Sequence, residues 1–123
     1  MKKILIIFVL LISSESLAFE KKTNFTFEKF KNSQKNGETI VINSWNKNCS
    51  TCAAQSKILV SAANDFKKVK FFFYEQTKYK NIANFLNIKF WSTIVVYKGE
   101  NEVAREIGLN NKDEIYKIIK KGT

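Results

Sequence analysis

Proline and histidine are absent from this chain of 123 residues, and cysteine occurs only twice. Without histidine there is no Ser-His or Cys-His nucleophile, no imidazole metal ligand and no histidine for haem attachment. Two cysteines also fall short of the four ligands that a tetrahedral structural zinc site needs within one chain. These absences exclude histidine-dependent hydrolase triads and a structural zinc site built within one chain.

The N-terminal end of the chain has the pattern of a secretory signal peptide. Lys2 and Lys3 give a basic start, nine apolar residues follow from Ile4 to Ile12, and Ser16-Leu17-Ala18 places small residues where signal peptidase cuts. Nine apolar residues are too few for a membrane span, which takes about 20. We therefore expect cleavage after Ala18 and export to the periplasm or another extracytoplasmic space, with no stable membrane anchor after cleavage.

The remaining sequence reads as one domain. A chain of this length buries enough surface for a single core, and no stretch has the composition of a linker or a repeat. The expected organisation is a signal peptide over residues 1–18 and one domain over residues 19–123.

Positive charge is in excess, with a formal net charge of +10. The basic residues are almost all lysine, Arg105 is the only arginine, and they are scattered over every predicted element instead of lying along one stripe. Such a distribution favours solubility and weak association, and we expect no nucleic-acid partner. Binding to nucleic acid or to an anionic membrane surface through lysine is the alternative, and it predicts steep salt dependence and no need for either cysteine.

The periodicity of apolar residues predicts the order α-β-α-β-α-β-β-α. The last helix has the clearest pattern, because Asn111 can cap it and three isoleucines form its buried stripe. Helices are expected over Thr26–Ser33, from Cys49 onward, over Ile82–Leu86 and after Asn111, and strands over Thr39–Ser44, Val69–Tyr74, Thr93–Tyr97 and Glu102–Ile107.

Both cysteines lie where a predicted strand leads into a predicted helix. Cys49 and Cys52 form a Cys-x-x-Cys pair, which can close into a disulfide across a very short loop. So short a loop restricts the unfolded chain very little, and a stabilising role is a poor explanation of the pair. At the start of a helix the unpaired amide N–H groups can stabilise a thiolate at Cys49, and the pattern indicates redox chemistry.

This order of elements, with Trp45 four residues before the first cysteine, resembles the thioredoxin family over essentially the whole mature chain. The resemblance implies an α/β thioredoxin fold, with a central four-stranded mixed sheet flanked by helices. The matching segments are Val41 to Trp45 for the family's strand and tryptophan, Cys49-Ser50-Thr51-Cys52 for its active-site motif, Thr93 to Lys98 for its central hairpin strand, and Gly108 for the glycine before its last helix.

The chain departs from the family beside the second cysteine. Asn43 stands where thioredoxins have a buried acid that accepts the proton of that cysteine. The lysine that pairs with the acid is also missing, since Phe71, Phe72 and Phe73 occupy its region. Asn43 is therefore the predicted proton-transfer position, and we expect slower resolution of the mixed disulfide.

A second departure concerns the substrate groove. Ser92 stands where the family has a cis-proline, and a cis bond before a non-proline residue costs ~2.5–4 kcal/mol. We therefore expect the Trp91-Ser92 bond to be trans and the groove to be reshaped, with Phe90 and Trp91 as an apolar lip. The resemblance implies a groove formed by Trp45, Trp91, Ser92 and Thr93.

Taken together, these features predict an exported thioredoxin-like thiol-disulfide oxidoreductase. Cys49 attacks a substrate disulfide as a thiolate and Cys52 resolves the mixed disulfide. The expected partners are protein disulfides or dithiols and a redox donor or acceptor protein, and we expect a monomer without a cofactor. The sequence sets neither the redox direction nor the substrate.

The alternative is a non-catalytic thioredoxin-fold module. Without a proline beside the dithiol the sulfurs are more accessible, and Cys49 and Cys52 could bind a protein partner or a soft metal. Two chains would together offer four thiolates to a soft metal or an iron-sulfur cluster.

Overall fold

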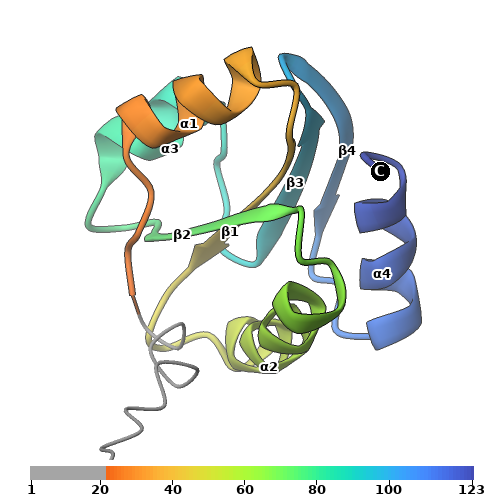
Figure 1. Ribbon diagram of the computed structural model, residues 1–123. Coiled ribbons are helices and arrows are strands. Elements are labelled where there is room, and N and C mark those ends of the chain that lie inside the picture. The colour runs from red at the N-terminus through yellow and green to blue at the C-terminus, as the bar shows by residue number, and fades with distance from the viewer. Residues whose placement is uncertain (1–21) are drawn as a thin grey trace, which may run out of the picture.

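The computed structural model describes residues 22–123, and the predicted signal peptide with its cleavage point lies outside them. The elements follow one another in the predicted order (Figure 1). Their bounds are α1 Phe27–Lys35, β1 Thr39–Trp45, α2 Ser50–Asp65, β2 Lys70–Glu75, α3 Lys80–Leu86, β3 Thr93–Lys98, β4 Asn101–Ile107 and α4 Lys112–Lys120.

The four strands form one mixed sheet in the order β2-β1-β3-β4. β1 pairs in parallel with β2 and antiparallel with β3, and β3 pairs antiparallel with β4. Helices α1 and α3 cover one face, whereas α2 and α4 cover the other (Figure 1). The expected four-stranded mixed sheet flanked by helices is thus confirmed. Within residues 22–123, no helix combines the length and the apolar character that crossing a bilayer requires.

The alternation of side chains along β1 assigns its residues to two cores. Ile40 and Ile42 pack into the core beneath α1 and α3, and Val41 packs into the core beneath α2 and α4. Asn43 follows Val41 by two residues and lies on the same face. The strand therefore places a polar side chain against the first turns of α2.

The free edge of β2 is covered by the segment that precedes α1. The Asn24 side chain accepts a hydrogen bond from the Phe73 N–H at 2.6 Å and donates one to the Phe71 carbonyl at 3.1 Å. The Asn24 N–H also donates to the Phe73 carbonyl at 3.0 Å. Phe25 then enters the core beneath α1 and α3. The extended segment around Asn24 thus hydrogen-bonds to the outer edge of β2 in the place where a further strand would pair.

The only arginine joins β4 to the end of α3. Arg105 donates to the carbonyls of Leu86 and Asn87, both at 2.9 Å, and pairs with Glu102 at 2.6 Å. Asn87 caps α3 in the left-handed conformation, with φ of 53°. The planar guanidinium reaches both carbonyls at once and fixes the start of the segment that leads to Ser92.

Candidate active site at the start of α2

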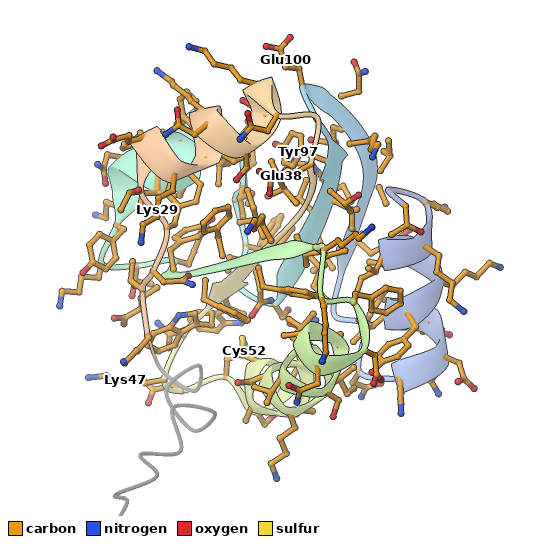
Figure 2. The ribbon with its side chains drawn as sticks, in the orientation of Figure 1. Lys29, Glu38, Lys47, Cys52, Tyr97 and Glu100 are labelled. Carbon is orange, nitrogen blue, oxygen red and sulfur yellow. A yellow bond between two sulfur atoms is a disulfide. The ribbon has the colours of Figure 1, made fainter. Side chains whose placement is uncertain are left out.

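Cys49 and Cys52 form a disulfide at the N-terminus of α2, and their Cα atoms are 5.2 Å apart. Cys49 is the N-cap residue, and its Sγ accepts a hydrogen bond from the Cys52 N–H at 3.1 Å. Cys49 is half-buried, whereas Cys52 is only 3% exposed and lies between the sheet and α2 (Figure 2). The first cysteine is thus the more accessible of the two.

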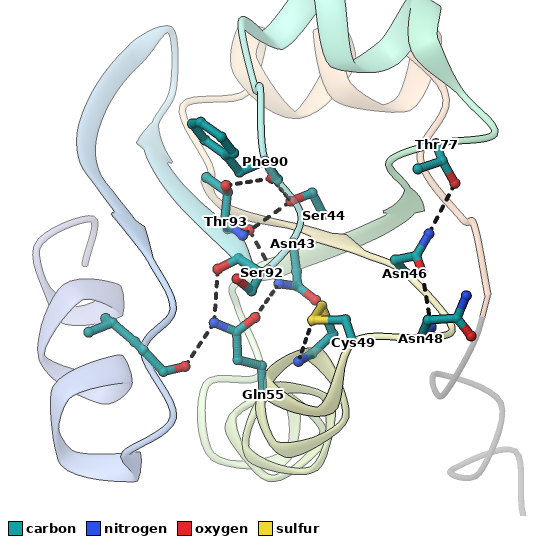
Figure 3. Close-up of a disulfide and its surroundings, with 12 residues drawn as sticks. Asn43, Ser44, Asn46, Asn48, Cys49, Gln55, Thr77, Phe90, Ser92 and Thr93 are labelled. Carbon is teal, nitrogen blue, oxygen red and sulfur yellow. Dashed lines mark hydrogen bonds between the residues drawn. A yellow bond between two sulfur atoms is a disulfide. The ribbon is translucent and has the colours of Figure 1, made fainter.

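The turn before Cys49 is fixed by Asn46. Its Oδ1 accepts from the Asn48 N–H at 2.9 Å, and its Nδ2 donates to the Thr77 hydroxyl at 3.0 Å (Figure 3). The Cys49 N–H donates to the Asn46 carbonyl at 3.2 Å. These bonds position the Cys49 sulfur just beyond the end of β1.

Asn43 is buried, with 1% of its surface exposed. Its Nδ2 donates to Gln55 Oε1 at 3.0 Å and to the Thr93 carbonyl at 3.2 Å. A backbone carbonyl only accepts hydrogen bonds, so the amide nitrogen and not the oxygen must face Thr93. The Asn43 Oδ1 therefore faces away from Thr93, and among residues 22–123 no donor hydrogen-bonds to it.

Gln55 is fully buried and bridges three parts of the chain. Besides accepting from Asn43, it donates through Nε2 to the carbonyls of Ser92 at 3.0 Å and Leu109 at 2.8 Å (Figure 3). Gln55 is not among the site residues predicted from the sequence. A signal was present, because Gln55 shares the buried stripe of α2 with Leu59 and Ala62, where a polar residue requires partners.

Ser92 has a left-handed backbone, with φ of 56°. Its N–H donates to the Ser44 carbonyl at 2.8 Å, and its carbonyl accepts from the Gly108 N–H at 2.9 Å. No peptide bond in residues 22–123 is cis, so the Trp91-Ser92 bond is trans, as expected. Ser92 therefore follows a path that proline, with φ near −65°, cannot take.

The neighbouring Thr93 is buried and holds the same loop from inside. Its hydroxyl donates to the Phe90 carbonyl at 2.7 Å. Ser44, a second residue outside the predicted site, donates to the Phe90 carbonyl at 2.8 Å and accepts from the Thr93 N–H at 3.1 Å. The loop before β3 thus depends on hydroxyl groups from two strands.

Two exposed apolar side chains lie in this loop, and a third lies at the end of the neighbouring strand β4. Phe90 is 60% exposed, Trp91 43% and Ile107 56%, and Ile107 pairs with Thr93 across the sheet. Trp45 is half-buried, and its indole N–H donates to the Lys22 carbonyl at 3.0 Å. The use of Trp45, Trp91, Ser92 and Thr93 as a substrate groove stays a prediction.

A cavity of about 120 Å³ lies beside the disulfide and is partly open to solvent. Both cysteines line it, together with polar, basic and apolar side chains from β1, α2 and β2. None of the lining residues is acidic. They are Asn43, Trp45, Asn46, Lys47, Cys49, Cys52, Ala53, Ser56, Lys57 and Phe73.

Solved structures with this fold include several thioredoxins. Trxlp from Edwardsiella tarda EIB202 has a TM-score of 0.73 at 18% identity, over 77% of this chain and 94% of that chain. Mitochondrial thioredoxin 3 from Saccharomyces cerevisiae, in its oxidised form, has a TM-score of 0.70 at 22% identity, over 87% of this chain and 98% of that chain. Fasciola hepatica thioredoxin has a TM-score of 0.69 at 23% identity, over 78% of this chain and 90% of that chain. At these identities the likeness concerns the fold.

No curated protein matches the chain. The thioredoxin family model matches residues 19–121, which is nearly all of the sequence beyond the predicted signal peptide. The matched region contains the Cys-x-x-Cys disulfide at the start of a helix and the mixed sheet that carries it. On this match, the chain belongs to the thioredoxin family.

Proposed function

We propose that this protein is an exported thiol-disulfide oxidoreductase that exchanges its Cys49–Cys52 disulfide with protein substrates. The observation that carries the proposal is the asymmetry of the pair. The half-buried sulfur of Cys49 caps α2 and can meet a substrate, whereas Cys52 is buried one turn further along.

The helix start supplies the reactivity that the first step requires. The Cys52 N–H points at the Cys49 sulfur from 3.1 Å, and an amide donor at a helix N-terminus favours the thiolate over the thiol. The reduced protein should therefore present an anionic Cys49 to solvent near neutral pH.

Reduction of a substrate proceeds in two exchanges. The Cys49 thiolate attacks one sulfur of the substrate disulfide, that disulfide breaks, and the other substrate sulfur leaves as a thiolate that takes up a proton. Cys52 then loses its proton and attacks the Cys49 sulfur, which releases the second substrate thiol. Two electrons pass from the dithiol to the substrate, and the reverse sequence oxidises a substrate dithiol.

The exposed side chains of Phe90, Trp91 and Ile107 support a polypeptide substrate. Phe90 and Trp91 lie in the loop that Gln55 ties to α2, and Ile107, at the end of β4, pairs with Thr93 directly after that loop; the three side chains are 43–60% exposed. Apolar contact of this kind suits an unfolded or extended chain around a cysteine, since it needs no specific side-chain pairing.

A trapping experiment tests the proposal. The Cys52→Ser variant should accumulate mixed disulfides with proteins of an extracytoplasmic extract, because the resolving thiol is gone. The Cys49→Ser variant is the matched control and should accumulate none. If neither variant forms mixed disulfides, and wild type does not speed the reduction of insulin by dithiothreitol, the oxidoreductase function is wrong.

Export rests on the pattern of residues 1–18 and is tested separately. The protein recovered from the extracytoplasmic fraction should begin at Phe19. Leu10→Lys, which interrupts the apolar run, should leave the full-length chain in the cytoplasm, and Leu10→Ile should be exported normally. Recovery of uncleaved wild-type protein in the cytoplasm would contradict the proposed localisation.

A further inference from the structure

We propose that the cavity beside the disulfide binds a carboxylate of the substrate, so that this protein acts preferentially on disulfides whose cysteines are flanked by aspartate or glutamate. The carboxylate pairs with Lys47 and Lys57, which are exposed and line the cavity. The inference deepens the proposed function and rests on it, since it names the class of protein substrate that the same two cysteines would meet.

The cavity adjoins the reacting sulfur. Both cysteines line it, and Cys49 is half-buried, so its sulfur can bond to a substrate cysteine there. Consecutive Cα atoms of a chain are about 3.8 Å apart, and the residues on either side of that substrate cysteine therefore lie within reach of the cavity. None of Phe90, Trp91 and Ile107 lines the cavity, which is thus a contact region separate from these apolar side chains.

Lys57 lies on the same face of α2 as the reactive cysteine. Cys49, Ala53 and Lys57 follow one another at intervals of four residues, and the Ala53 N–H donates to the Cys49 carbonyl at 3.2 Å. Side chains of a helix tilt toward its N-terminus, which for Lys57 is the direction of Cys49. Ala53 is small and exposed, so it leaves the space between the lysine and the sulfur open.

Lys47 supplies a second cation from the turn before α2. It lies two residues before Cys49, in the turn that the Asn46 side chain fixes with two hydrogen bonds. Figure 2 shows Lys47 at the same end of the molecule as Cys52. Because the backbone of this turn is already held in place, only the lysine side chain has to become ordered when an anion binds.

No acidic side chain of the described residues neutralises these two cations. Glu75 lies opposite Trp45 in the neighbouring strand, with its carboxylate 3.5 Å from the Thr77 hydroxyl, and it does not line the cavity. Asp65 is at the other end of α2, where it accepts from the Tyr116 hydroxyl.

Neither lysine forms an ion pair within residues 22–123, and both are positively charged at neutral pH. The cavity therefore favours an anion, and the carboxylates of aspartate and glutamate are the anions that an unmodified polypeptide carries along its chain.

A series of three peptides measures the preference. Each peptide contains one disulfide, and the residues beside both cysteines are glutamate, glutamine or lysine. The reduced protein is mixed with each peptide at low salt, and its oxidation is followed by tryptophan fluorescence. The reaction of the same peptides with dithiothreitol gives their intrinsic reactivity. The quantity compared is the glutamate-to-glutamine rate ratio of the protein divided by that of dithiothreitol. This quantity should exceed one for wild type and approach one at high salt, and the lysine peptide should react slowest.

Double variants assign the preference to the cavity. Lys47→Gln combined with Lys57→Gln should lower the ratio roughly two- to fivefold for each lysine removed, the range expected for an exposed ion pair. Lys47→Arg combined with Lys57→Arg keeps both charges and should keep the ratio. Lys117→Gln combined with Lys120→Gln removes two charges from the exposed surface of α4 and should also keep it. A changed reactivity of the Cys49 thiolate alters the rates with all three peptides alike and leaves the ratio unchanged.

A binding titration repeats the test without thiol chemistry. The oxidised protein is titrated with glutamate and glutamine peptides in which serine replaces both cysteines, and the backbone amide signals are followed by NMR. The signals of Lys47, Ala53 and Lys57 should shift more with the glutamate peptide, and those of α4 should not move.

The outcomes separate the inference from the proposed function. If the glutamine peptide is reduced, a wild-type ratio of one, or an equal fall of the ratio in the Lys47→Gln, Lys57→Gln and the Lys117→Gln, Lys120→Gln double variants, would overturn the inference and leave the function standing. Wild-type protein that reduces none of the peptides would count against the function. The titration then decides the inference alone, and equal shifts with the glutamate and glutamine peptides would overturn it.

Discussion

Replacing the fully buried Gln55 by glutamate should make the stability of this protein strongly dependent on pH. The Gln55 Nε2 donates to the Ser92 and Leu109 carbonyls at 3.0 and 2.8 Å, and a carboxylate there would face two acceptors without water. The carboxyl group introduced by Gln55→Glu must therefore stay protonated in the folded protein, with its pKa raised above the unfolded value.

The magnitude follows from the cost of keeping the acid neutral. A glutamate side chain in the unfolded chain has a pKa of about 4.3. Keeping the carboxyl group protonated in the folded state lowers the free energy of unfolding by about 1.4 kcal/mol for each pH unit above this value, which amounts to about 3.7 kcal/mol at pH 7 and about 1.1 kcal/mol at pH 5. The protonated acid has one donor where the amide had two, which removes a further ~1 kcal/mol at every pH. Because the folded-state pKa is raised, the lost stability returns as the pH falls toward 4.

Urea unfolding followed by tryptophan fluorescence at several values between pH 4 and pH 8 measures the difference between wild type and Gln55→Glu. Asn64→Asp, an amide-to-acid change on the exposed surface of the same helix, is the control and should cost less than about 0.5 kcal/mol at every pH. A difference for Gln55→Glu that does not change with pH would refute the argument, since it would mean that the carboxylate is solvated or paired.

Three further predictions concern other parts of the site and fold. Ser92→Pro should lower the free energy of unfolding by at least about 2 kcal/mol in a urea melt, because the N–H donation to the Ser44 carbonyl is lost and φ of 56° is closed to proline; an unchanged midpoint would show that the loop rebuilds freely. In the reduced protein Cys49 should react with iodoacetamide before Cys52 near neutral pH, as mass spectrometry after brief treatment will show, and preferential labelling of Cys52 would reverse the assigned roles. Partial burial and the hydrogen bond to Asp65 raise the pKa of Tyr116 from 10.0 to about 12. Tyr116→Phe should therefore cost about 0.5–1 kcal/mol below pH 10, a gap that closes as the pH rises toward 12, and a gap that persists there would point to ring packing instead.

The sequence alone predicted the order of the elements because the apolar periodicities are strong. The cap at Asn111 is confirmed, since its side chain accepts from the N–H groups of Asp113 and Glu114. The trans bond before Ser92 also followed from a local energy difference that does not depend on the fold. Local rules were sufficient wherever a residue's surroundings are set by its near neighbours in the chain.

Gln55 and Ser44 were not predicted, because their partners lie far away in sequence. Gln55 bonds residues 37 and 54 positions later, and Ser44 bonds residues nearly 50 positions later. Only the sheet order brings these segments together, and a polar residue on an apolar stripe signals that partners exist without saying which. The left-handed backbone of Ser92 is likewise held by tertiary bonds that no local pattern encodes.

The cover over β2 matters for aggregation. The strand Lys70–Glu75 consists mainly of aromatic residues without proline, and such segments stack readily into cross-β assemblies when their edge is free. In the folded protein that edge is occupied by the segment around Asn24, whose side chain imitates the pairing of a backbone amide. A nick or truncation that releases this short segment would expose an aromatic template for other copies of the chain. Colloidal stability of the protein is thus tied to a few residues at the start of the described chain.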